Sequence, residues 1–486
     1  MKPKVLVSIF ILCAILSASA NPPASKSIST TEIAAWMLAG VPNSRLVRLV
    51  QERGLAGNPS AAEMRDLESV GADAKLIRTL SLHKSPGTSP KSCLPEALLK
   101  AFTAARHEDF HAAEVQLRKA LQADSENAAL HFALAAMLEK QEQWDDAYDE
   151  ITISNKLMPD LPENHSAFAY IFYRLDDGPN AVAEARTALS MDPQNAEAYQ
   201  FLGLALYSSD QYAAAIHAYE ESLARDPENP DTYYDMGIAY HAAENLSASQ
   251  AAYAKAIKLR PAFWEARSNL ALTLHEKGKL DEAATEYREA KRIAPDEASV
   301  RNNLANTYCD QGKFDEAIAE LHELYRQHPE WEQGHGCMAS AYMAKKNYEA
   351  AVSELQLALR INPTGALEHR VLGQALMLDD KPEEALREFR LAVTLNPDSD
   401  VSHHFLAMAL FEQHQLQAAE KEFREAVRLK ASAENHYSLA ACLTSMDRYE
   451  EALSEMELAA KLDPERQLYR ARHEELLKLM KTANTP

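Results

Sequence analysis

The chain has 486 residues, of which 7% are aromatic and only 14 are glycine. So few aromatic and tight-turn residues disfavour a large β-sandwich or barrel. Lys and Arg number 50 against 72 Asp and Glu, which gives a net charge of −22 with histidine neutral. The composition therefore favours a folded, mainly helical protein. The negative charge repels phosphate backbones and anionic headgroups, so we expect a protein that does not bind nucleic acid.

The first twenty residues have the pattern of an export signal. Residues 2–4 carry two lysines, residues 5–16 are apolar but short for a bilayer span, and residues 18–20 read Ala-Ser-Ala. We expect a signal peptide over 1–20, cleavage after Ala20, and a periplasmic or secreted protein. An uncleaved anchor is the alternative. No later stretch is apolar enough to cross a membrane, so the mature chain is expected to have no membrane span.

Residues 28–84 are predicted to form a small helical domain. Its four short helices are expected over 32–39, 44–53, 61–69 and 73–82, separated by glycine- and proline-containing segments. Two of these segments look like diverged copies, which predicts a double hairpin. Residues 85–93, rich in Ser, Pro and Gly, are predicted to be a linker.

A proline recurs every 34 residues through most of the remaining chain: Pro159, Pro193, Pro227, Pro261, Pro295, Pro329, Pro363 and Pro397. This spacing divides 94–466 into eleven units, numbered here as repeats 1 to 11: 94–127, 128–161, 162–195, 196–229, 230–263, 264–297, 298–331, 332–365, 366–399, 400–432 and 433–466. Position 8 of every unit is Ala or Gly, and position 20 is Ala or Ser. Because small residues let two antiparallel helices approach closely, each unit is predicted to be a helix, a turn and a second helix.

This pattern resembles the tetratricopeptide repeat (TPR) family. In repeat 4 the signature positions are occupied by Tyr199, Leu202, Gly203, Ala215, Tyr219 and Pro227. The resemblance implies an all-α fold, a right-handed superhelical solenoid of antiparallel helix pairs whose first helices line a concave groove. The domain at 28–84 loosely resembles modules placed ahead of TPR arrays in exported bacterial proteins. Residues 467–482 are predicted to form a C-terminal capping helix.

If the family geometry holds, positions 2, 5, 9, 12 and 13 of each repeat face the groove. In repeats 2 to 5 these positions carry rings with polar tips, with Glu163, Glu197 and Asp231 beside them, which suits an adaptable peptide site. The candidate protein- or peptide-binding residues are Phe132, Tyr170, Tyr173, Arg174, Tyr207, Tyr234 and His241. The alternative is that some of the tyrosines pack between helices.

A more apolar stretch further along is a second candidate, for binding a partner helix or the chain's own end. It consists of Met343, Met377, Leu378, Met408 and Phe411.

Three patterns that suggest metal or redox chemistry are interpreted as structural. Residues 107–111 read His-Glu-Asp-Phe-His, a literal HExxH, but the repeat phase places this string across the turn of repeat 1 instead of on one continuous helix. Position 4 is histidine in six repeats: His131, His165, His335, His369, His403 and His436. We interpret these as packing residues and expect no metal, with a coupling to pH as the less favoured alternative. Cys93, Cys309, Cys337 and Cys442 are scattered, which implies neither a zinc knuckle nor a dense disulfide framework, and most of them are predicted to be small packing residues.

The sequence therefore predicts a non-enzymatic extracytoplasmic scaffold or adaptor that binds a protein or peptide in its concave groove, without a cofactor. The alternative is a structural subunit of a cell-envelope or secretion assembly. An enzyme with an unrecognised site is the third hypothesis, because no glycine-rich phosphate loop or strand–helix alternation accompanies the repeats.

Overall fold

The computed structural model describes residues 26–82 and 93–483, with side chains up to residue 478. The predicted signal peptide and almost all of the predicted linker lie outside these residues. The chain divides after Glu244 into two compact units. The described residues contain helices throughout and no strand beyond one isolated parallel bridge between Ile28 and Leu55. The predicted all-α fold is therefore confirmed.

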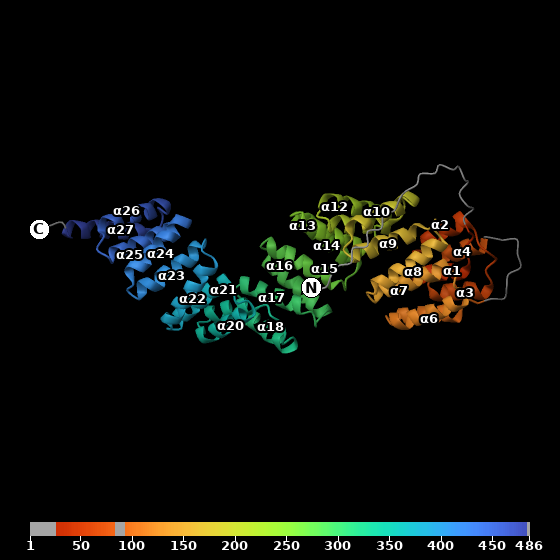
Figure 1. Cartoon of the computed structure of the whole chain (residues 1–486), viewed down its shortest axis with the longest axis horizontal. Helices are drawn as coiled ribbons and strands as arrows, with labels where there is room; N and C mark the ends of the chain where they lie inside the picture. Colours follow the sequence, from red (N-terminus) through yellow and green to blue (C-terminus); the bar gives the residue numbers. More distant parts are fainter. Residues whose placement is uncertain (1–25, 83–92, 484–486) are drawn as a thin grey trace, which may run out of the picture. The chain divides into compact units, whose positions relative to one another are not determined.

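Unit 1 begins with four short helices and continues with longer, paired ones (Figure 1). The helices are α1 (Thr30–Leu38), α2 (Asn43–Arg53), α3 (Ala61–Val70), α4 (Ala74–Leu82), α5 (Glu96–Arg106), α6 (Phe110–Ala123), α7 (Ala128–Lys140), α8 (Trp144–Leu157), α9 (Pro162–Arg174), α10 (Gly178–Met191), α11 (Ala196–Tyr207), α12 (Tyr212–Arg225) and α13 (Pro230–Ala242).

Unit 2 begins with α14, continues with six helix pairs and ends with a single helix. The helices are α14 (Leu246–Leu259), α15 (Trp264–Glu276), α16 (Leu280–Ile293), α17 (Ala298–Asp310), α18 (Phe314–Gln327), α19 (His335–Ala344), α20 (Tyr348–Ile361), α21 (Ala366–Leu378), α22 (Pro382–Leu395), α23 (Asp400–Glu412), α24 (Leu416–Leu429), α25 (Ala433–Thr444), α26 (Tyr449–Leu462) and α27 (Gln467–Ala483).

The turn inside each repeat has the same backbone conformation in all eleven repeats. The residue at position 15 of each repeat lies in this turn and has a φ between +57° and +73°: Glu108, Glu142, Asp176, Asp210, Glu244, Gly278, Gly312, Lys346, Asp380, His414 and Asp447. Only two of these are glycine, although the left-handed region costs other residues roughly 1–2 kcal/mol. The repeated turn confirms the register of eleven tandem repeats.

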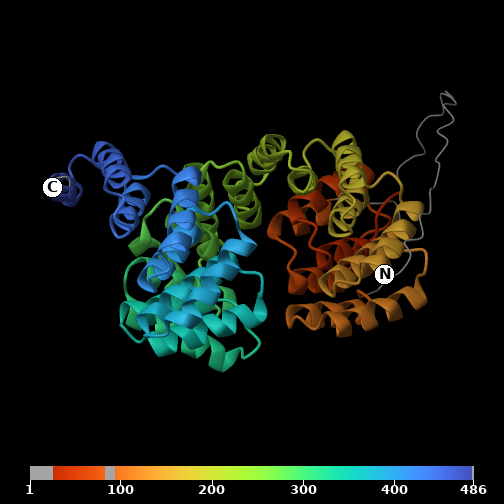
Figure 2. The same cartoon turned by 60° about the vertical axis from the view of Figure 1, so that its left-hand side comes forward.

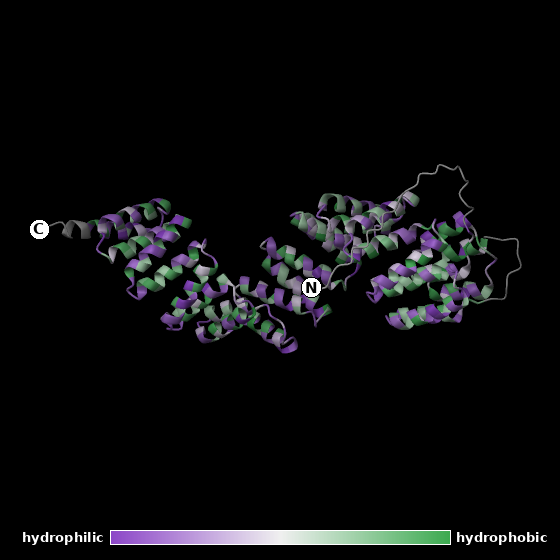
Figure 3. Ribbon diagram, in the orientation of Figure 1, coloured by the Kyte–Doolittle hydropathy of each residue, from purple (hydrophilic) through white to green (hydrophobic). Residues whose placement is uncertain are grey.

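The small residues at position 8 make room for a large ring at position 24 of the same repeat. A Cβ atom added to Gly203 would lie 2.4 Å from a ring carbon of Tyr219, and one added to Gly373 would lie 2.6 Å from a ring carbon of Phe389. Both rings are only 1% exposed. Hydrophobic and hydrophilic residues alternate along the helices (Figure 3), as expected for helices that each bury one side.

The four predicted N-terminal helices are present, but they do not form the predicted double hairpin. Helix α1 packs mainly against α7 and also contacts α5, while α2 packs against α4. In two views 60° apart, the red N-terminal helices lie beside the orange helices of the first repeats (Figures 1 and 2). Ile33 and Trp36 of α1 belong to the same hydrophobic core as Leu134 of α7. Contacts with repeats 1 and 2 therefore replace the hairpin pairing.

Two of the cysteines form a disulfide, which corrects their interpretation as packing residues. Cys309 on α17 is bonded to Cys337 on α19, with their Cα atoms 6.1 Å apart. Helix α19 begins only at His335, after Gly334 with a φ of +100°, and is 10 residues long. The disulfide thus joins the first helix of repeat 7 to the first helix of repeat 8, which is about one helical turn shorter.

Candidate functional site

The first helices of repeats 3, 4 and 5 are neighbours in unit 1. Helix α9 contacts α11, and α11 contacts α13. Because the repeats share one register, the same positions of these helices recur side by side. Most of the predicted groove residues lie on these three helices, at positions 2, 5, 9, 12 and 13.

Phe132 does not belong to an open groove. This ring, at position 5 of repeat 2, is 7% exposed, and Ala129 at position 2 is fully buried. Both belong to the core that α7 shares with α1. The prediction that Phe132 faces a ligand is therefore wrong for this structure, because the chain's own N-terminal helix packs on that helix.

Tyr170 is the centre of a cluster of rings on α8, α9 and α11. It stacks on Phe201 with ring centroids 4.9 Å apart and meets Trp144 edge-to-face at 5.9 Å. The guanidinium of Arg174 lies 4.3 Å from the Trp144 ring centroid and donates a hydrogen bond of 3.2 Å to the Tyr170 hydroxyl. Tyr173 also lies 6.3 Å from Tyr170.

We define Tyr170, Tyr173, Arg174 and Phe201 as the ring cluster. Its tyrosines are half-buried, so part of each ring still meets solvent. Phe201 and Trp144 were missed from the sequence because they occupy positions 6 and 17, which the groove template omits. A search for rings one helical turn from Tyr170 would have found neither, since both contacts join different helices.

Next to the ring cluster, a carboxylate lies among tyrosines. Asp235 on α13 accepts a 2.8 Å hydrogen bond from the side-chain amide of Gln200 on α11. Burial raises the pKa of Asp235 to about 7, despite that hydrogen bond. Burial and the Asp235 charge together raise the pKa of Tyr173. The ring centroids of Tyr207 and Tyr212 are 5.6 Å apart. Tyr234 and His241 lie on α13, the first helix of repeat 5, and both are half-buried.

Three glutamates from successive repeats form an acidic cluster, defined here as Glu139, Glu163 and Glu197. They occupy position 12 of repeat 2 and position 2 of repeats 3 and 4. Burial and the charge of Glu197 raise the pKa of Glu139 to about 8. Glu197 keeps access to solvent, but surrounding protein displaces much of its hydration, and together with the Glu163 charge this raises the pKa of Glu197 to about 7.

The N-terminal helices partly neutralise this cluster. Arg45 Nε on α2 donates a 2.5 Å hydrogen bond to Glu163 Oε1, and Arg48 pairs with Asp192 at 3.0 Å. The other oxygen of Glu163, Oε2, is buried and has no hydrogen-bond partner among the described residues. A pocket of about 450 Å³ lies between residues 40–48 and repeats 3 and 4, lined by Arg45, Glu163 and Glu197 among others.

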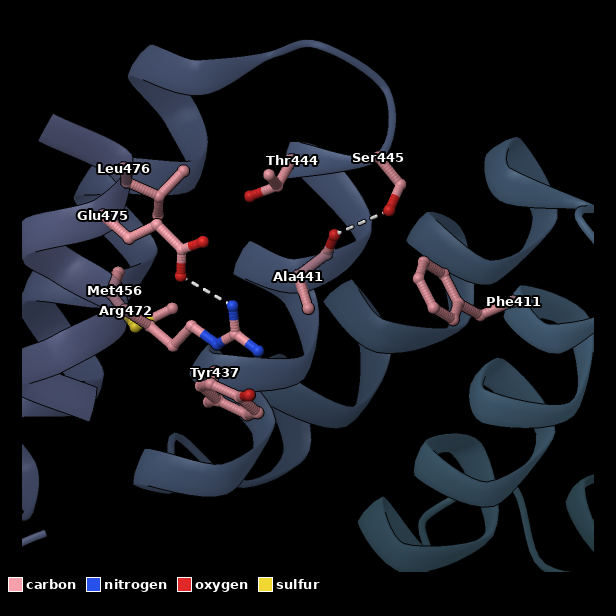
Figure 4. A pocket seen from close by; sticks show the side chains of 9 residues that line it. All are labelled: Phe411, Tyr437, Ala441, Thr444, Ser445, Met456, Arg472, Glu475 and Leu476. Carbon is pink, nitrogen blue, oxygen red and sulfur yellow. Dashed lines mark hydrogen bonds and ion pairs between the residues drawn. The ribbon is translucent and has the colours of Figure 1, made fainter. Parts of the chain in front are cut away.

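One residue of the second candidate stretch lines a pocket that the C-terminal helix also lines. Phe411 on α23 lines a pocket of about 230 Å³ together with Tyr437 of α25 and Leu476 of α27. Figure 4 shows Arg472 and Glu475 of α27 joined by an ion pair over the Tyr437 side of this pocket. Phe411 lies across this pocket from the α27 side chains (Figure 4), and Met408 of the same stretch is 39% exposed.

The HExxH string spans a turn, as predicted. Helix α5 ends at Arg106, α6 begins at Phe110, and Glu108 between them has a φ of +59°. His107 and His111 are both exposed and lie on opposite sides of this turn. They therefore do not form the one-turn histidine pair of a zinc-protease helix.

The histidine column forms a ladder of pairs inside the repeats. Each histidine Nδ1 lies 2.5–2.8 Å from a glutamate oxygen at position 23 of the same repeat: His131–Glu150, His165–Glu184, His335–Glu354, His369–Glu388, His403–Glu422 and His436–Glu455. Repeats 6 and 7 use arginine at the same position, as Arg267–Glu286 and Arg301–Glu320. The column thus joins the two helices of a repeat, a role that the packing interpretation did not include.

Comparisons with known proteins agree with the kind of repeat. Profiles described as tetratricopeptide repeat match residues 234–298, 274–341, 338–364 and 406–466, and one described as TPR repeat matches 203–244. No curated protein sequence matches the chain. With its helix pairs and repeated turns, the molecule is an α-helical repeat protein. More narrowly, it belongs to the tetratricopeptide repeat proteins.

Several solved structures are similar in fold. A tetratricopeptide repeat protein from Parabacteroides merdae is 15% identical, with 51% of this chain and 98% of that chain covered and a TM-score of 0.42. Yeast Tom70 is 14% identical, with 79% and 94% covered and a TM-score of 0.36. MamA from Desulfovibrio magneticus RS-1 is 17% identical, with 35% and 95% covered and a TM-score of 0.33. Among the helices described, none has both the length and the apolar character needed to span a bilayer.

Proposed function

We propose that this protein is a non-enzymatic scaffold or adaptor that binds a segment of a partner protein on the concave side of repeats 3 to 5. The ring cluster carries this proposal. Its tyrosines present apolar ring faces and hydroxyl groups while remaining half-buried. Such rings lose little conformational entropy on binding and are typical anchors at protein interfaces.

The test compares two kinds of variant. Tyr170→Ala combined with Tyr207→Ala is expected to weaken partner capture by more than about 30-fold while leaving the unfolding temperature almost unchanged, because anchor residues contribute about 2 kcal/mol or more. Ala215→Leu enlarges a fully buried residue and is expected to lower the unfolding temperature instead. Capture is measured with partners identified by cross-linking in the producing cells. Equal losses of stability in both variants would mean that the rings are core residues.

We also propose that the protein acts outside the cytoplasm. The lysine-containing start, the short apolar run and the Ala-Ser-Ala sequence support this location. The Cys309–Cys337 disulfide supports it independently, because structural disulfides persist in oxidising compartments. Mass analysis of protein from the producing cell is expected to find Asn21 at the N-terminus. A chain that retains Met1 and carries both cysteines reduced would contradict the proposal.

A further inference from the structure

The carboxyl groups of the acidic cluster are incompletely paired. The side chains of Glu139 on α7 and Glu197 on α11 make no hydrogen bond or ion pair in the described part of the chain, whereas those of Asp192 and Asp235 nearby are both paired. Glu163 is 4% exposed, and only one of its two oxygens has a partner. A buried carboxylate oxygen without a donor costs free energy that a bound cation would recover.

The chain's own cations do not fill this role. Arg45 is already engaged by Glu163, and Arg48 by Asp192. Arg225 at the far side of the pocket pairs with Glu221 at 2.7 Å and lies 4.2 Å from the Tyr199 ring centroid. Lys140 lowers the pKa values of Glu139 and Glu197, but these two pKa values still remain far above those of ordinary carboxyl groups. Two carboxyl groups are therefore left without an ion pair beside the pocket, and a bound cation would stabilise their ionised forms.

The same helices also present the rings that an extended segment would need. Arg174 belongs to the ring cluster, and its charge lowers the pKa of Glu139, so the acidic cluster and the rings are close enough to interact electrostatically. The pocket of about 450 Å³ beside Glu197 exceeds the size of a lysine or arginine side chain. Charge and shape thus favour a cationic side chain carried by a longer segment.

We infer that the partner binds as an extended basic segment, whose lysine or arginine side chain enters the pocket beside Glu163 and Glu197 while neighbouring residues pack on the ring cluster. This inference rests on the proposed function and specifies the chemistry of the partner. A nucleic acid or an acidic segment does not fit, because either would add negative charge to carboxylates that already repel one another.

The direct test uses fluorescein-labelled 12-residue peptides of alternating lysine and serine, with a glutamate–serine peptide of the same length for comparison. Binding is measured by fluorescence anisotropy at about 150 mM salt, where long-range attraction by the net charge of the protein is largely screened. The lysine peptide is expected to bind and the glutamate peptide is not. Glu139→Gln combined with Glu197→Gln is expected to weaken binding of the lysine peptide at least 10-fold.

A matched control removes the same charge elsewhere in unit 1. Glu126 and Asp149 are both exposed, and Glu126→Gln combined with Asp149→Asn changes the net charge equally. This control is expected to alter affinity less than twofold. Equal weakening by the two double variants, or binding of the glutamate peptide as tight as that of the lysine peptide, would overturn the inference.

A peptide-display selection on the full chain separates this inference from the proposed function. Enrichment of lysine- and arginine-containing sequences, with binding lost on removing Glu139 and Glu197, supports both. Enrichment of sequences without basic residues, with binding lost in the Tyr170→Ala/Tyr207→Ala variant, overturns the basic segment but keeps the peptide-binding groove. Failure to enrich any sequence that depends on these residues overturns both.

Discussion

The His131–Glu150 pair predicts a pH-dependent contribution to the stability of repeat 2. His131 Nδ1 lies 2.5 Å from Glu150 Oε2, and the two side chains are 11% and 14% exposed. Burial opposes protonation of His131, but hydrogen bonds with Glu150 and the Ser125 carbonyl outweigh it, so its pKa is raised above the usual value. The pair is therefore strongest when the imidazole is charged.

Proton linkage determines whether this stabilisation rises or falls with pH. Because the folded state holds the His131 proton more tightly than the unfolded state, this stabilisation is fully present below the ordinary histidine pKa of about 6.5 and is lost as pH rises through the folded value. Glu150→Gln keeps an acceptor oxygen but removes the charge. We expect it to lower the free energy of unfolding by about 2 kcal/mol near pH 5.5 and by less than about 1 kcal/mol near pH 8.5.

Repeat 6 provides a matched control for this measurement. Arg267 pairs with Glu286 at 2.8 Å in the same positions, and arginine stays charged at both pH values. Glu286→Gln is therefore expected to cost the same at pH 5.5 and 8.5. Hydrogen exchange of amides in α7 and α8, and in α15 and α16, reports each repeat separately, since repeat arrays can unfold in parts. A Glu150→Gln effect that does not change with pH would refute the reasoning.

Three further predictions concern the core, the disulfide and the acidic cluster. Gly203→Ala is expected to lower the free energy of unfolding by about 1–3 kcal/mol in urea titrations, because the new methyl group would overlap the Tyr219 ring. Peptide mapping without reductant is expected to find Cys309 linked to Cys337, and reduction of this disulfide is expected to speed amide hydrogen exchange in α19. Glu139→Gln is expected to raise the unfolding temperature more at pH 8.5 than at pH 5.5. The reason is that the folded pKa of Glu139 is raised to about 8, so the folded protein loses stability as pH rises from the ordinary carboxyl pKa towards that value, and glutamine removes this loss. An unchanged unfolding temperature at both pH values would contradict this.

The 34-residue period was sufficient to predict the repeat register, because the contacts that define a repeat lie within it. Gly203 and Tyr219 are in one helix pair, and so are the turn residues with positive φ. Each repeat buries the same sides of its helices against the same neighbours, so one spacing recurs eleven times in the sequence. The glutamates of the histidine ladder were also visible at a constant spacing of 19 residues, but only the structure shows that the side chains meet.

Contacts between distant parts of the chain were decided by tertiary structure alone. Arg45 and Glu163 are 118 residues apart in sequence and meet only in the folded chain, where α2 is brought close to α9. That packing buries Phe132, which repeat position alone had placed in an open groove. Local periodicity reports which side of a helix is buried, but it does not report whether a neighbouring repeat, the N-terminal helices or a partner covers that side. Which surface of repeats 3 to 5 remains uncovered therefore depends on where the N-terminal helices pack.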